Sequence, residues 1–181
     1  MSSPYFIDES RRAYDGQFLS VREDSVSLES GHSFTYELVE HPGGAAILPI
    51  DAAGNCYLVK QYRHPVEQDV LEIPAGRLEN DGSSPSDNAI RECQEEVGFC
   101  PKSVTPLGYV LPSPGVVQER IHLFLGQDLE PTDAQPDPGE ILEVVVLQYE
   151  VLLKMVLDGR ISDAKTALAT IRAAPLIQKQ S

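Results

Sequence analysis

The segment from Ser84 to Gly98 constrains the fold of this chain more than any other part of the sequence. The run Ser84-Pro85-Ser86-Asp87 predicts a helix start, because a serine N-cap, a proline at the first helical position and an acid completing a capping box occur together. Gly98 is typical of a helix end. Between them, apolar residues recur at helical spacing and predict one buried face, formed by Ile90, Cys93 and Val97.

The rest of the chain alternates apolar strand patterns with turns. We expect strands at 18–28, 34–39, 45–50, 56–62, 70–73, 104–111, 121–125 and 141–147, and further helices at 150–157 and 163–173. Strands and helices are mixed without regular βαβ alternation, which predicts an α+β layered domain. The hairpin before Gly44 is expected to form a small N-terminal subdomain.

Composition excludes several classes of protein. The 181 residues carry a net charge of −14, which argues against binding to nucleic acid but suits a divalent cation. Three scattered cysteines are too few for a disulfide framework. Neither a signal peptide nor an apolar run of about 18 residues is visible, so a cytoplasmic protein without a membrane span is expected.

The predicted helix carries three carboxylates on one side. Glu92, Glu95 and Glu96 span about 100° of its circumference, so their charges repel each other unless a cation joins them. Hard oxygen ligands favour Mg²⁺ or Mn²⁺ over zinc. The alternative is a solvated acidic face containing an Arg91–Glu95 salt bridge.

The stretch from Gly76 to Phe99 resembles a Nudix box, G-x5-E-x7-R-E-U-x-E-E-x-G-U with U apolar. Its second half matches at every fixed position, through Arg91, Glu92, Cys93, Glu95, Glu96, Gly98 and Phe99. Its first half departs twice: the stretch is one residue longer than the pattern, and Ser83 replaces the first Glu. In the family that Glu braces the loop before the helix, so the replacement bears on loop rigidity more than on metal binding.

Further segments are similar to the ADP-ribose pyrophosphatase group of this family, namely 61–63, 113–115 with Glu119, 139–144 and 161–166. The resemblance implies a Nudix fold, a mixed β-sheet sandwiched between helices, in a hydrolase domain of residues 45–181. Residues 1–44 would be an antiparallel β subdomain that forms a homodimer, as members commonly do.

The resemblance also implies roles for individual residues. Glu92, Glu96 and the carbonyl of Ala75 would bind Mg²⁺, with Glu95 as a further ligand or a catalytic group. Glu140 would be the general base or an extra ligand, its alternative being an ordinary loop residue. Glu72 is a weaker candidate for contact with water or metal.

The implied substrate contacts are made by other residues. Arg63 would bind the diphosphate, since a guanidinium holds two phosphate oxygens at once. Ser113 and Glu119 would contact sugar hydroxyls, and Gly115 would allow close backbone approach. Tyr36 stands where many relatives have an arginine before Glu37, which favours a substrate other than ADP-ribose. His41 is interpreted as a residue that packs in a turn.

The leading hypothesis is Mg²⁺-dependent hydrolysis of ADP-ribose to AMP and ribose 5-phosphate. A close alternative is hydrolysis of other nucleoside diphosphate sugars, such as GDP-mannose. The hypothesis from a different class is a noncatalytic Nudix module that binds a nucleotide. The retained carboxylates argue against that module, because such modules can lose their metal ligands and keep the fold.

Overall fold

The computed structural model describes residues 3–17, 19–79, 81–135, 139 and 141–177. The chain divides into two compact units. Unit 1 comprises residues 1–43 and 111–120, and unit 2 comprises residues 44–110 and 121–181. The segment 111–120, which the sequence groups with the C-terminal domain, thus packs with the N-terminal strands.

Unit 1 is a four-stranded sheet in the order β1-β2-β3-β9. Its strands are β1 (Phe6–Asp15), β2 (Ser20–Ser27), β3 (Ser33–Glu40) and β9 (Val117–Gln118). The predicted hairpin is confirmed, since β2 pairs with β3 in antiparallel register. The sequence gives no sign of β1, because all ten of its residues are exposed and no apolar alternation marks a buried face.

Unit 2 contains two sheets. The first, in the order β7-β4-β10-β8, is mixed and consists of β4 (Gly44–Pro49), β7 (Ala75–Arg77), β8 (Phe99–Val110) and β10 (Ile121–Pro131). The second is antiparallel, in the order β11-β5-β6, and consists of β5 (Asn55–Arg63), β6 (Gln68–Glu72) and β11 (Leu142–Gln148). A short 3₁₀ turn (His64–Val66) joins β5 to β6.

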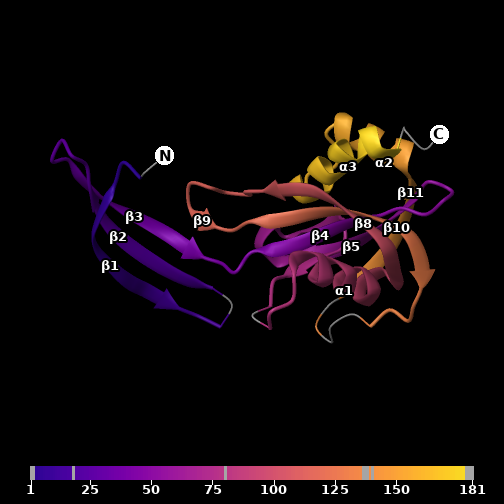
Figure 1. The fold of residues 1–181 in the computed structure, drawn as a ribbon, viewed down its shortest axis with the longest axis horizontal. Helices are drawn as coiled ribbons and strands as arrows, with labels where there is room; N and C mark the ends of the chain where they lie inside the picture. The colour runs from indigo at the N-terminus through magenta and orange to yellow at the C-terminus, as the bar shows by residue number, and fades with distance from the viewer. Residues whose placement is uncertain (1–2, 18, 80, 136–138, 140, 178–181) are drawn as a thin grey trace. The chain divides into compact units, whose positions relative to one another are not determined.

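Three helices cover the strands of unit 2: α1 (Pro85–Val97), α2 (Tyr149–Leu157) and α3 (Ala164–Ile177). Figure 1 shows α1 on one side of these strands and α2 with α3 on the other. Side chains alternate between the faces of a strand. On β4, accordingly, Ala46 and Leu48 pack in the cluster beneath α2 and α3, whereas Ala45 and Ile47 pack in the cluster beneath α1. The predicted α+β fold with strands between helices is confirmed.

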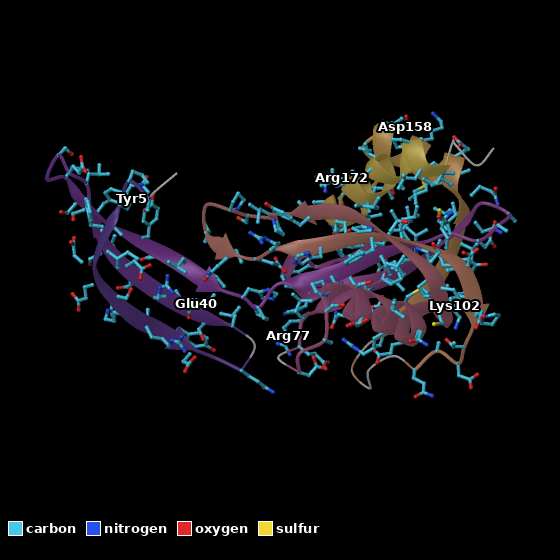
Figure 2. All side chains as sticks on the ribbon, viewed as in Figure 1. Tyr5, Glu40, Arg77, Lys102, Asp158 and Arg172 are labelled. Carbon is cyan, nitrogen blue, oxygen red and sulfur yellow. The ribbon has the colours of Figure 1, made fainter. Side chains whose placement is uncertain are left out.

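Several elements extend beyond their predicted ends. Strand β10 continues to Pro131, past its predicted end at Leu125. Strand β8 begins at Phe99, five residues before the predicted start, because its first residues pair with the end of β10. Helix α3 continues past Ala173 to Ile177 and contains Pro175 in its last turn. Arg172 of α3, labelled in Figure 2, donates hydrogen bonds to the carbonyl oxygens of Leu107 and Tyr109 at 2.9 and 3.1 Å. Among the described residues, no helix has the length and hydropathy needed to span a membrane.

Candidate active site

Local interactions at its ends fix the length of α1. The Ser84 hydroxyl accepts a hydrogen bond from the N–H of Asp87 at 3.2 Å, and the Asp87 carboxylate accepts one from the N–H of Ser84 at 3.0 Å. This is the predicted capping box. Gly98 ends the helix with a φ of +74°, a conformation that favours glycine.

The buried side of α1 has an apolar part and a polar part. Ala89, Cys93 and Val97 pack in the apolar cluster beneath the helix, whereas Ile90, predicted on this face, is only partly buried. Glu92 and Glu96 lie one turn apart and are buried on the same side of the helix. The helix therefore holds two carboxylates at the edge of the core, where charge is costly unless it is compensated.

Glu95 is placed differently from Glu92 and Glu96. It is more exposed and is paired with Arg91, which also donates to Glu92 and to the side-chain oxygen of Asn88. Burial opposes the charge of Arg91, but the carboxylates of Glu92 and Glu95 outweigh that effect and raise the pKa of the guanidinium above its ordinary value. The salt bridge described as the alternative role of Glu95 is thus present.

The backbone of β7 lies directly against the Glu92 carboxylate. A Cβ atom at Gly76 would stand 1.8 Å from Glu92 Oε1, so any larger residue here would displace the Glu92 carboxylate. The preceding backbone is fixed from two sides: the N–H of Ile47 donates to the carbonyl of Pro74 at 3.0 Å, and Ala75 pairs with Ala46. The predicted ligand Ala75 therefore stands on a rigid strand next to the carboxylate helix.

Arg63 and Glu72 form a two-pronged ion pair at the ends of β5 and β6. The Nε and Nη2 atoms of Arg63 donate to the two oxygens of Glu72 at 2.7 and 2.8 Å. Hydrogen bonding to Glu72 raises the pKa of Arg63, and the negative charges of Glu96 and Asp163 raise it further. Burial favours the neutral form of Glu72, but Arg63 and Lys165 outweigh it and hold the pKa of the carboxyl below its ordinary value.

The start of α3 completes this group of charges. Lys165 is paired with Glu72 and with Asp163, and the Asp163 carboxylate accepts the N–H of Thr166 at 2.9 Å. The Thr166 hydroxyl accepts the N–H of Ile73 at 2.8 Å. Neither Lys165 nor Thr166 was predicted as a site residue. The sequence signal that could have identified them is the acid, lysine and threonine at the start of this helix.

The predicted substrate residues Ser113, Gly115 and Glu119 belong to unit 1. The Ser113 carbonyl accepts the N–H groups of Val116 and Val117 at 3.1 and 2.8 Å, which closes a turn. Gly115 and Tyr36 line one cavity of about 380 Å³.

The other predicted residues of unit 1 lie close together. Glu119 Oε1 is 3.4 Å from Nδ1 of His41, and that nitrogen also accepts the N–H of Gly43 at 3.1 Å. His41 therefore packs in a turn. The predicted base Glu140 lies outside the described residues.

The donor set on α1 and β7 fits a hard divalent cation. Among residues 3–17, 19–79, 81–135, 139 and 141–177, no three His, Cys, Asp or Glu side chains converge as a metal site. Mg²⁺ does not require three such side chains, because it keeps several waters and binds through one or two carboxylates and the substrate phosphates. Two buried carboxylates, of which Glu92 lies against the backbone of Gly76, meet this requirement.

Another cavity of unit 2 lies apart from these residues. It has a volume of about 970 Å³ and is bordered by the turn 51–54 and the β10 segment 127–130. None of the predicted site residues lines it, so its size does not make it the candidate active site.

Comparison with known proteins shows which family this chain is similar to. A family model described as NUDIX domain matches residues 40–168. An ADP-ribose pyrophosphatase of Bacillus subtilis (strain 168) is 36% identical over 158 residues, which cover 86% of this chain and 85% of that protein. A GDP-mannose pyrophosphatase of Yersinia enterocolitica is 34% identical over 161 residues, covering 76% of this chain and 83% of that protein.

Two further matches widen the comparison. A methanol dehydrogenase activator of Bacillus methanolicus is 32% identical over 163 residues, covering 89% of this chain and 88% of that protein. A crystal structure of an ADP compounds hydrolase superimposes with a TM-score of 0.86 at 20% identity, covering 99% of this chain and 97% of that one. At that identity the likeness concerns the fold alone, and it confirms the predicted fold.

Proposed function

The chain belongs to the Nudix hydrolase family, and from this membership we propose that it hydrolyses the pyrophosphate bond of ADP-ribose to AMP and ribose 5-phosphate. The observation that carries the proposal is the pair of buried carboxylates on α1, Glu92 and Glu96, of which Glu92 lies against the Gly76 backbone of β7. Two ADP-ribose pyrophosphatases among the relatives, 36% and 35% identical to this chain, support the choice of substrate.

The reaction adds water across the P–O–P linkage, whose negative charge normally repels nucleophiles. Bound Mg²⁺, held by Glu92, Glu96 and the carbonyl of Ala75, would supply neutralisation of the charge that develops on the phosphoryl oxygens. Arg63 contacts Glu72 through Nε and Nη2. It would bind diphosphate oxygens through the edge of the guanidinium that carries Nη1. Glu140 would take the proton of the attacking water, a role that suits a carboxylate on a loop.

A second candidate substrate is GDP-mannose, which one relative's name specifies. The residue that favours it is Tyr36, which precedes Glu37 where the family resemblance implies an arginine. Its ring lies 5.2 Å from that of Phe34 and 5.7 Å from that of Tyr5, as an edge-to-face group. Such a group would contact a base by stacking and would not select a phosphate by charge.

The proposal is tested by measuring hydrolysis of a substrate panel with Mg²⁺ and with Mn²⁺. The panel contains ADP-ribose, GDP-mannose, UDP-glucose and diadenosine polyphosphates, each at matched concentration. A preference for ADP-ribose is expected. A clear preference for GDP-mannose would overturn the substrate, and absence of turnover with every compound and metal would favour a noncatalytic binding module.

We also infer that the protein is a homodimer formed through unit 1. The described part of unit 1 exposes large apolar side chains, comprising Tyr5, Phe6, Ile7, Tyr14, Leu19 and Tyr36. Exposed apolar side chains in this number are consistent with an interface between copies of the chain. Sedimentation velocity should show a dimer that Phe6→Ser with Ile7→Ser dissociates, and a wild-type monomer at all concentrations would contradict it.

Three free thiols support a cytoplasmic location, which fractionation of cells would test.

A further inference from the structure

A continuous group of four charged side chains joins the start of α3 to the diphosphate-binding candidate Arg63. Glu72 lies at its centre with only 4% of its side chain exposed. Its Oε2 atom is contacted by both Arg63 and Lys165. Lys165, 11% exposed, also lies 3.0 Å from Asp163. One buried carboxylate is therefore shared by two cations from elements far apart in the sequence.

The contact with Glu72 uses only some of the donors of the Arg63 guanidinium. It presents Nε and Nη2 to Glu72, so the donors of Nη1 remain directed elsewhere. The side chain is 40% exposed and borders a cavity of about 450 Å³, which Lys165 also lines. The negative charge of Glu96 on α1 acts on the same guanidinium. Arg63 is thus placed between the carboxylate helix and the start of α3.

The charges of the group balance only when Lys165 is included. Glu72 and Asp163 are two anions, and Arg63 and Lys165 are two cations. Without the ammonium group, two carboxylates would face a single guanidinium, and the buried Glu72 would depend on Arg63 alone as its counter-ion. The excess negative charge would oppose an incoming diphosphate and hold Arg63 against Glu72.

From this arrangement we propose that Lys165 is a positioning residue for the reaction proposed above. Lys165 and Arg63 together neutralise Glu72. Lys165 thereby keeps the Nη1 edge of Arg63, which does not contact Glu72, available to the substrate diphosphate. Lys165 acts through Glu72 and does not itself contact the phosphates. The inference rests on the proposed function, because it assumes a diphosphate substrate bound by Arg63.

The first experiment compares the kinetics of Lys165→Met, Lys165→Arg and the wild type. Loss of the cation should raise KM about tenfold and leave kcat within about twofold, since binding to a charged group is lost without loss of a reacting group. Lys165→Arg should restore KM. The matched control is Lys154→Met, which removes an exposed lysine of α2 paired with Asp158 and should leave both constants unchanged.

A double-mutant cycle with Arg63→Met separates positioning from direct contact. If Lys165 acts through Arg63, adding Lys165→Met to Arg63→Met raises KM no further. An additional tenfold rise in the double variant would show direct phosphate contact and overturn the inference. Equal losses in kcat and kcat/KM in Lys165→Met and Lys165→Gln, with lowered melting temperatures, would also overturn it.

Binding of ADP with metal removed by chelation keeps the inference separate from the proposed function. Calorimetric titration should show weaker ADP binding for Lys165→Met and for Arg63→Met, with no further weakening in the double variant. If the wild type binds ADP in this way but hydrolyses no diphosphate, the proposed function fails and the positioning role stands. If Lys165→Met binds ADP as the wild type does, the positioning role fails.

Discussion

The two compact units of the chain are stabilised by different interactions, although both are built from strands. Unit 2 contains two buried apolar clusters, one on each side of its sheets. The described residues of unit 1 include one buried apolar side chain, Val26. Its strands are joined by backbone hydrogen bonds and by exposed ion pairs such as Arg12–Glu40, whose net contribution is small. A sheet of this kind gains stability when another surface covers its apolar face.

The two units also differ in how many carboxylates they bury. Among the described residues, unit 1 buries Asp24, which is paired with Arg22, whereas unit 2 buries three. Burying a carboxylate costs free energy that hydrogen bonds and opposite charges must offset. Unit 2 buries Glu72, Glu92 and Glu96 beside its clusters. A well-packed core can tolerate such residues, and perturbed ionisable groups are typical of active sites. The proposed chemistry therefore belongs to unit 2, and the proposed base contact and dimer interface belong to unit 1.

The largest expected effect is on catalysis in unit 2. Glu96→Gln keeps the size of the side chain but removes a charge at the proposed metal site. Activity should fall about 10³-fold or more, because metal ligation is worth several kcal/mol in the transition state. Initial rates of ADP-ribose hydrolysis check this, with circular dichroism to show that the fold is retained.

The control for this variant is Glu130→Gln, which removes an exposed carboxylate of β10 paired with Lys102. Its rate should equal that of the wild type. If both variants lose activity alike, the effect is one of overall charge. If neither loses activity, the chemistry does not depend on the buried carboxylates of α1.

The next largest effect concerns packing. Leu48 is fully buried beneath α2 and α3, and Leu48→Ala should lower the free energy of unfolding by about 2–5 kcal/mol through lost transfer energy and a cavity. Val26→Ala in unit 1 removes less apolar volume and should cost about 1.5 kcal/mol. Urea denaturation measures both. Equal losses would mean that unit 1 has a core comparable to that of unit 2.

Much of unit 2 could be predicted because its residues obey short-range rules. The capping box, the glycine end of α1 and the short apolar run of β4 all follow from neighbouring residues. Strand β1 could not be predicted, because backbone pairing with β2 leaves no apolar pattern. The contact of Lys165 with Glu72 joins residues 93 positions apart, and no local rule specifies such a pair.

A smaller effect depends on pH. Because the folded pKa of Glu72 lies below its ordinary value of 4.5, its ionised form stabilises the fold above that value and loses the effect as pH falls through the folded pKa. Glu72→Gln should therefore lower the melting temperature at pH 7, and the difference from the wild type should narrow below about pH 4.5. Thermal unfolding of the variant and of the wild type at pH 7 and at pH 3 measures this difference in melting temperature. A difference that stays constant down to pH 3 would show that the charge of Glu72 is not its source.

The smallest expected effect concerns the ion pairs on the surface of unit 1. Arg12 is 53% exposed and lies 2.8 Å from Glu40 and 3.1 Å from Asp15, so water and salt screen its charge. Arg12→Gln should cost no more than about 1 kcal/mol of unfolding free energy, and 1 M NaCl should abolish the difference because it shortens the Debye length to about 3 Å. Urea denaturation at low and high salt measures both values. A loss of unfolding free energy above about 2 kcal/mol that persists in high salt would mean that the stability of unit 1 depends strongly on its ion pairs. The contrast with unit 2, whose stability depends on its apolar core, would then fail.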